Sequence, residues 1–209
     1  MQCPLKEDCP KEQISKRVVQ SRLLLGEGPD EKNFFEAFLR FLGIKGIQPM
    51  QYGGKNALLG FLELVTKSQP EFMQVTHLAI TADANGNESG TLASLREAFG
   101  RFGMPIPDDR RFATNGHITT GMFVVRDRLE TVCLNSLRGQ AAERCIEQYL
   151  ECVGYGASPG NREKAKSRVY LSCKDNSTLS LGVAALKGYW DYQNQAFDDI
   201  RSFLQELAR

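Results

Sequence analysis

Oxygen-bearing side chains stand at or just beyond the ends of three apolar runs in this sequence. They are the carboxylates of Glu27, Asp83 and Glu130, and Asn85 adds an amide oxygen beside Asp83. Carboxylate and carbonyl oxygens are the ligands that hard cations such as Mg²⁺ and Mn²⁺ prefer. Carboxylates that gather without a cation repel one another. The residue types therefore predict a site for Mg²⁺ or Mn²⁺, provided that the fold brings them together.

Four apolar runs are expected to form the strands that would do this, at residues 21–26, 44–52, 75–82 and 121–126. The first and third are nearly continuous in apolar residues, as is typical of strands buried on both faces. Helical patterns at 29–42, 55–66 and 88–102 separate the strands. This alternation predicts an α/β fold with a mostly parallel sheet and helices on both faces. Ligands of such sheets bind at the carboxyl ends of the strands, where the acidic side chains would meet.

The pattern becomes mainly helical after Asp127, with expected helices at 129–137, 140–153, 161–171 and 195–207. Residues 1–15 are polar and are expected to form a flexible leader. We therefore predict one α/β domain at 16–209, with its core at about 20–130 and a helical C-terminal extension.

Charge and hydropathy exclude some classes of protein. The 209 residues carry 26 Lys and Arg against 25 Asp and Glu, a net charge of +1. This balance excludes a uniformly basic nucleic-acid binder but permits a local cationic groove. No apolar run approaches the roughly 18 residues that a membrane helix needs. The first residues do not form a signal peptide either, so the expected location is the cytoplasm, without membrane contact.

Lys55 is the candidate cation for phosphate chemistry. It follows Gly53 and Gly54 at the expected start of a helix, where backbone N–H groups and an ammonium could meet a phosphate. A solvated lysine at a helix start is an equally good interpretation. The P-loop and G-x-G-x-x-G patterns of common nucleotide-binding enzymes are absent.

Three other acidic residues, Asp30, Glu31 and Glu88, stand at the expected starts of helices. Carboxylates there usually cap the helix or interact with its dipole. We therefore expect them to be structural. Glu27 and Asp83 differ because each ends a buried run and has glycine or asparagine close by.

Together these motifs resemble the Toprim domain of topoisomerases, primases and the overcoming-lysogenization-defect (OLD) nucleases. The family motif is a glutamate after the first strand and Asp-x-Asp after the third, here Gly26-Glu27-Gly28 and Asp83-Ala84-Asn85. The resemblance covers roughly residues 20–130. The segments at 127–130 and 187–190 are similar to those of a prokaryotic stand-alone Toprim-like family related to OLD-type nucleases.

The resemblance implies a Rossmann-like Toprim fold and a divalent metal. It assigns Glu27 as an acid/base group or metal ligand and Asp83 as a metal ligand. Asn85 stands where the second aspartate is expected, so it offers an oxygen but no charge. Glu130 is the residue that we expect to supply the missing charge.

A small Mg²⁺-dependent nuclease acting on DNA or RNA is the leading functional hypothesis, with Glu27 and Lys55 as catalytic residues. No convincing tyrosine nucleophile supports a topoisomerase. The alternative is a non-catalytic Toprim-like module that binds nucleic acid, a nucleotide or a protein partner, and Asn85 favours it. OLD-type nucleases carry an ATPase domain, so an ATPase or another protein is an expected partner, and a homo-oligomer is also expected.

Overall fold

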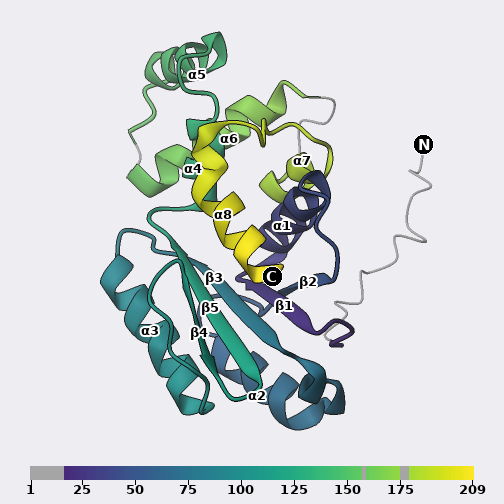
Figure 1. The fold of residues 1–209 in the computed structure, drawn as a ribbon. Helices are drawn as coiled ribbons and strands as arrows, with labels where there is room; N and C mark the ends of the chain where they lie inside the picture. Colours follow the sequence, from purple (N-terminus) through teal and green to yellow (C-terminus); the bar gives the residue numbers. More distant parts are fainter. Residues whose placement is uncertain (1–16, 157–158, 175–178) are drawn as a thin grey trace, which may run out of the picture.

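A five-stranded sheet forms the centre of the computed structural model, which describes residues 17–156, 159–174 and 179–209 (Figure 1). The expected leader at 1–15 lies outside these residues. The strand order is β2-β1-β3-β5-β4. The strands are β1 (Arg22–Gly26), β2 (Ile47–Gln51), β3 (His77–Asp83), β4 (Arg111–Asn115) and β5 (Ile118–Val125).

The sheet is mostly parallel, as the sequence predicted. Strand β1 pairs in parallel with both β2 and β3, and β3 pairs in parallel with β5. Only β4 is antiparallel, and it pairs with β5. The carboxyl ends of β1, β3 and β5 therefore meet at one edge of the sheet.

Two apolar layers cover the sheet, and the side chains of β1 alternate between them. Leu24 packs in the layer that contains α1 (Pro29–Phe41), α7 (Leu181–Leu186) and α8 (Asp198–Leu207). Leu23 and Leu25 pack in the other layer, with α2 (Leu58–Ser68) and α3 (Glu88–Arg101). All three leucines are fully buried. The continuous apolar run is thus explained by helices on both faces.

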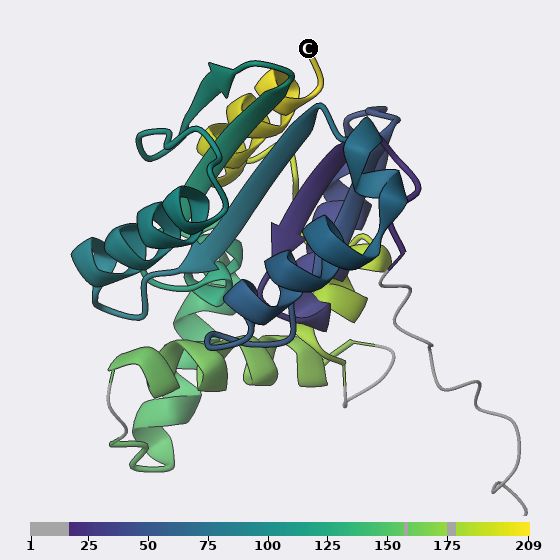
Figure 2. The same cartoon turned by 90° about the horizontal axis from the view of Figure 1, so that it is seen from below.

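Three further helices gather beyond the carboxyl ends of the parallel strands (Figure 2). They are α4 (Leu129–Asn135), α5 (Ala141–Cys152) and α6 (Pro159–Ser172). Short 3₁₀ turns at Pro70–Gln74 and Gln195–Phe197 complete the described elements, and the second leads directly into α8. None of the helices within the described residues is long and apolar enough to span a bilayer.

Strand β4 was not among the strands predicted from the sequence. Three of its five residues are polar and none of the five is buried, because an edge strand pairs on one side only. Gly116 and His117 connect it to β5, with Gly116 at φ 62°. Strand β5 accordingly begins at Ile118, earlier than the predicted 121.

Helix α2 also differs, since it begins at Leu58 instead of Lys55. The chain before it is held by the end of β1. The backbone N–H groups of Gly53 and Gly54 both donate to the Glu27 carbonyl, at 3.1 and 2.9 Å. These N–H groups are therefore already hydrogen-bonded and cannot bind a phosphate as the sequence suggested.

Helix α7 was not predicted, and it is fastened to the start of α1. The Asp30 carboxylate accepts hydrogen bonds from the Ser180 hydroxyl at 2.5 Å and from the Gly182 N–H at 2.9 Å. Trp190 supports the same helix, because its indole N–H donates to the Leu181 carbonyl and its ring stacks on Tyr170. Trp190 of the 187–190 segment is therefore a packing residue.

Gly182 gives a direct test of this α1–α7 contact. A Cβ at Gly182 would lie 2.6 Å from the Asp30 carbonyl oxygen, whereas a Cβ at Gly60 of α2 would meet nothing within 4 Å. We expect Gly182→Ala to lower the free energy of unfolding by about 1–3 kcal/mol through overpacking. Gly60→Ala is expected to raise it by about 0.5–1 kcal/mol through helix propensity. Urea denaturation measures both, and equal effects of the two substitutions would contradict the close contact.

Candidate active site

The four predicted oxygen ligands line one cavity at the carboxyl edge of the sheet. Glu27, Asp83, Asn85 and Glu130 surround a space of about 210 Å³. They come from the ends of β1 and β3 and from the first turn of α4, which follows β5. The structure therefore brings together residues separated by more than a hundred positions, as the parallel sheet requires.

Backbone hydrogen bonds hold the loop that carries Glu27. The buried hydroxyl of Thr81 in β3 donates to the Leu25 carbonyl at 3.0 Å, which joins β1 to β3 next to the site. The Glu27 carbonyl accepts the two glycine N–H groups described above. Its backbone is thus fixed from both neighbouring strands, while its carboxylate is left for the cavity.

The loop after β3 is held in the same way. Its backbone N–H groups at Ala84 and Asn85 donate to the carbonyls of Val125 and Asp127, at 2.8 and 3.0 Å. Asn85 has φ 50°, a left-handed conformation that asparagine tolerates better than most residues. Its side-chain Nδ2 donates to the Asp83 carbonyl at 3.2 Å. This exposed asparagine is therefore positioned by the end of β5.

Negative charge dominates the cavity and affects Asp83 most. Burial raises the pKa of the Asp83 carboxyl well above its usual value, and the carboxylates of Glu31, Glu130 and Glu27 raise it further. Arg128 acts in the opposite direction. Burial and neighbouring negative charge therefore both disfavour the ionised form of Asp83.

Glu31 lines the cavity and also caps helix α1. Its carboxylate accepts a hydrogen bond from the Gly28 N–H at 2.8 Å. Burial raises the pKa of Glu31, backbone hydrogen bonds counteract this, and the charges of Glu27 and Asp30 add to the rise. Glu31 and Asp30 therefore have the structural roles expected for residues at a helix start, although both border the cavity.

Two cations at the cavity were not predicted as site residues. Arg128 is the residue before α4, and Lys164 lies on α6. The place of Arg128 after β5 was a usable signal, since the residues that end parallel strands share this edge. Lys164 had no local signal, because only the packing of the helical part brings α6 to the sheet edge.

The donor set fits a hard divalent cation chemically, since it consists of carboxylate and amide oxygens. Within the described ranges, however, no three His, Cys, Asp or Glu side chains lie close enough together to bind one metal ion. The side chains would have to converge on a cation.

Lys55 does not line this cavity. It lies exposed in the turn between β2 and α2, and the N–H groups of the two preceding glycines donate hydrogen bonds to the Glu27 carbonyl. Its catalytic role remains a prediction from the sequence alone.

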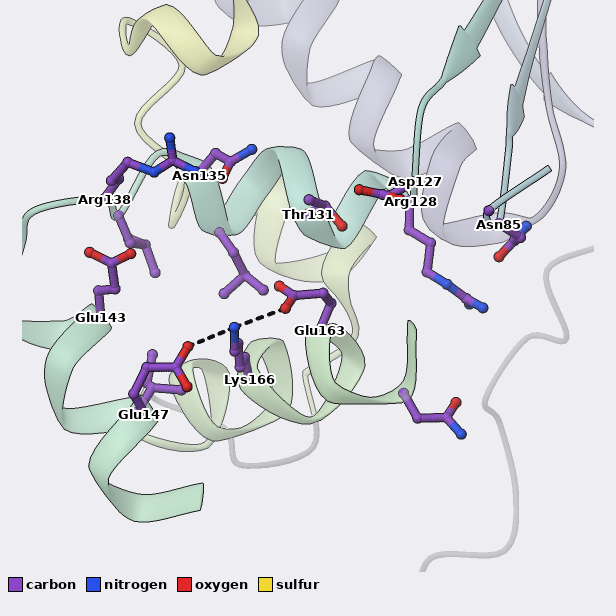
Figure 3. Close-up of a pocket in the computed structure, with 15 residues that line it drawn as sticks. Asn85, Asp127, Arg128, Thr131, Asn135, Arg138, Glu143, Glu147, Glu163 and Lys166 are labelled. Carbon is purple, nitrogen blue, oxygen red and sulfur yellow. Dashed lines mark hydrogen bonds and ion pairs between the residues drawn. The ribbon is translucent and has the colours of Figure 1, made fainter. Parts of the chain in front are cut away.

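A second, larger cavity of about 650 Å³ adjoins the first (Figure 3). It lies among α4, α5 and α6, and it shares Asn85 and Arg128 with the carboxylate cavity. Glu147, Lys166 and Glu163 form a row of ion pairs on its wall. The helical part of the chain thus extends the site beyond the sheet edge.

Comparison with known proteins supports the fold and places the chain in a family. The solved C-terminal region of the Xanthomonas campestris pv. campestris OLD protein matches with a TM-score of 0.51 and 17% identity, over 91% of this chain and 96% of that one. The corresponding region of the Burkholderia pseudomallei OLD protein matches with a TM-score of 0.48 and 15% identity, over 91% and 100%. The first match confirms the predicted OLD-like Toprim fold.

The family model described as "Protein of unknown function (DUF3226)" matches residues 21–209. None of the curated proteins matches the chain. The matched residues include β1, the carboxylate cavity and every helix described above. The chain therefore belongs to the DUF3226 family.

Proposed function

We propose that this protein is a divalent-metal-dependent nuclease that hydrolyses phosphodiester bonds in DNA or RNA. The observation that carries the proposal is the position of Glu27, Asp83 and Glu130 around one cavity of an OLD-like Toprim fold. Asn85 adds a neutral oxygen donor to the same cavity. Burial and the neighbouring carboxylates raise the pKa of Asp83, so a cation bound there would stabilise its ionised form.

Mg²⁺ or Mn²⁺ bound by these oxygens would neutralise charge on the scissile phosphate. The residues themselves supply the remaining functions. Glu27, held firmly by its backbone, can take a proton from an attacking water as a general base. Arg128 and Lys164 place positive charge beside the carboxylates, where an anionic phosphate would approach.

A second candidate is a non-catalytic module that keeps the fold and binds nucleic acid, a nucleotide or a protein partner. Asn85 in place of an acidic ligand favours this alternative, because it lowers the charge available to a metal. Calorimetric titration separates the two. Binding of Mg²⁺ or Mn²⁺ that Asp83→Asn removes supports the nuclease, and no binding at millimolar metal supports the module.

Cleavage should depend on the cavity carboxylates. We expect Glu27→Gln and Asp83→Asn each to lower the rate at least about 100-fold, because a general base and a metal ligand are lost. The assay uses single- and double-stranded DNA and RNA with Mg²⁺ or Mn²⁺, and EDTA should abolish cleavage. Glu88→Gln is the matched control, since Glu88 lies at the start of α3 outside the cavity. Undiminished cleavage by both cavity variants would refute the assignment.

Asn85→Asp should strengthen metal binding by about tenfold, because added ligand charge raises the affinity of oxygen sites for hard cations. Aspartate tolerates the left-handed backbone at this position nearly as well as asparagine does. Asn87→Asp adds the same charge two residues away at the N-cap of α3, where the two residues are equivalent. Calorimetry with Mn²⁺ compares the variants, and an equal gain for both would show that position 85 contributes no ligand.

Stability should show the opposite pattern from activity. Because the pKa of Asp83 is higher in the folded state, folding takes up protons, and the free energy of unfolding falls as the pH rises from the unfolded pKa through the folded one. Asp83→Asn removes this loss of stability, because the amide does not ionise. We expect the substitution to raise Tm in EDTA at neutral pH by about 2–4 °C, which corresponds to an increase in the free energy of unfolding on the order of 1 kcal/mol.

Thermal unfolding across pH, with and without Mg²⁺, measures this effect. Mg²⁺ should stabilise the original protein more than Asp83→Asn, because the variant has lost a ligand. Asp108→Asn serves as the control at an exposed aspartate outside the cavity. A lower Tm for Asp83→Asn in EDTA would show that the carboxylate cluster is not under strain.

A further inference from the structure

The larger cavity has the size of a ligand site and opens toward the carboxylates. Its volume of about 650 Å³ lies within the roughly 300–1,000 Å³ typical of small-molecule sites. Asn85 and Arg128 line both cavities, so they mark the junction between them. A molecule bound at the carboxylates could therefore continue into the larger space.

Most charged groups on the wall of the larger cavity already have a hydrogen-bond or ion-pair partner. Lys166 Nζ lies 2.6 Å from a Glu147 oxygen and 2.8 Å from a Glu163 oxygen. The Glu143 carboxylate accepts the Gly139 N–H at 2.7 Å. Arg138 donates to the Asn135 side-chain oxygen at 3.1 Å. With four carboxylates and three cations on its lining, this cavity would repel a phosphate but can accept a neutral polar group.

Arg128 differs from these groups. Its guanidinium has no hydrogen bond or ion pair with any residue in the described part of the chain, although the side chain is partly buried. Figure 3 shows it reaching away from α4 toward the loop that holds Asn85, with no dashed line to any residue drawn. A guanidinium offers five N–H donors in a planar fork that matches phosphate oxygens. Its donors thus remain available at the junction of the two cavities.

We propose that Arg128 binds a phosphate of the nucleic-acid strand at this junction, and that the larger cavity holds the nucleoside attached to that phosphate. This inference rests on the proposed nuclease function and adds the position of the strand. The charge pattern supports it, since Arg128 is the one cation among the described residues that lines both cavities, and it lies next to the carboxylates. The neutral nucleoside of the nucleic acid then lies against the wall of the larger cavity, where most charged groups already have partners.

Binding of the 5′-phosphorylated dinucleotide of thymidine, measured by calorimetry in Ca²⁺, tests the phosphate contact. We expect Arg128→Gln to weaken this binding at least about tenfold, because charge-assisted hydrogen bonds are lost. Arg128→Lys keeps the charge without the fork and should weaken binding less. Arg144→Gln removes the same charge from an exposed position on α5 outside the cavity and should change affinity less than about twofold. Equal affinities for all four proteins, or no binding at all, would overturn the proposal.

Asn135→Trp tests the nucleoside cavity, because Asn135 is exposed on its wall and an indole would fill part of the space. The substitution should weaken binding of the dinucleotide but leave binding of inorganic phosphate unchanged. Unchanged dinucleotide binding would overturn this part. Circular dichroism and Tm verify that each variant is folded, and Arg128→Lys replaces Arg128→Gln if the latter does not fold.

Cleavage assays separate this inference from the nuclease proposal. If Arg128 is needed for dinucleotide binding but no DNA or RNA is cleaved, the binding site stands and the nuclease assignment fails. If the protein cleaves nucleic acid and Arg128→Gln does so with unchanged KM, the nuclease stands and this site fails.

Discussion

Repulsion among carboxylates at one edge of the sheet is the constraint on which the site depends. Parallel pairing of β1, β3 and β5 places Glu27, Asp83 and Glu130 around one small cavity. The raised pKa of Asp83 records the cost, which burial and like charge impose together. Backbone hydrogen bonds hold the site in place despite this cost, such as those from the Gly53 and Gly54 N–H groups to the Glu27 carbonyl. A rigid frame around a destabilised charge is typical of a functional site.

The sheet and the acidic residues could be predicted because both signals are local. A run such as Leu23 to Leu25 is typical of a strand buried on both faces, and the residues just after it lie at the carboxyl edge of the sheet. Strand β4 could not be predicted, since an edge strand with only two apolar residues forms only when β5 is present to pair with it. The start of α2 was placed too early for a similar reason. The preceding loop is fixed by two hydrogen bonds to the Glu27 carbonyl, just after β1, and no local pattern reveals them.

The cations of the site follow the same division between local and tertiary signals. Arg128 follows the end of β5 by three residues, so the rule that ligands bind at the carboxyl ends of parallel strands covers its position, even though its role was not predicted. Lys164 depends on how α6 packs against the sheet edge, and helix packing has no short-range signature. Asp30 shows the reverse case, in which a carboxylate beside the cavity is committed to Ser180 and Gly182 of the segment that starts α7. Proximity to the cavity is therefore not sufficient to assign a role.

The site combines carboxylates with two cations. Strand ends supply Glu27 and Asp83 and the first turn of α4 supplies Glu130, whereas α6 supplies Lys164 and the residue before α4 supplies Arg128. A neutral asparagine at position 85 fits this balance, because a further carboxylate would raise the repulsion that the nearby cations only partly offset. Asn85 also holds its loop by donating to the Asp83 carbonyl, which a carboxylate could not do. If a cation binds as proposed, the departure from Asp-x-Asp would lower the affinity for the metal and reduce the repulsion among the side chains in its absence.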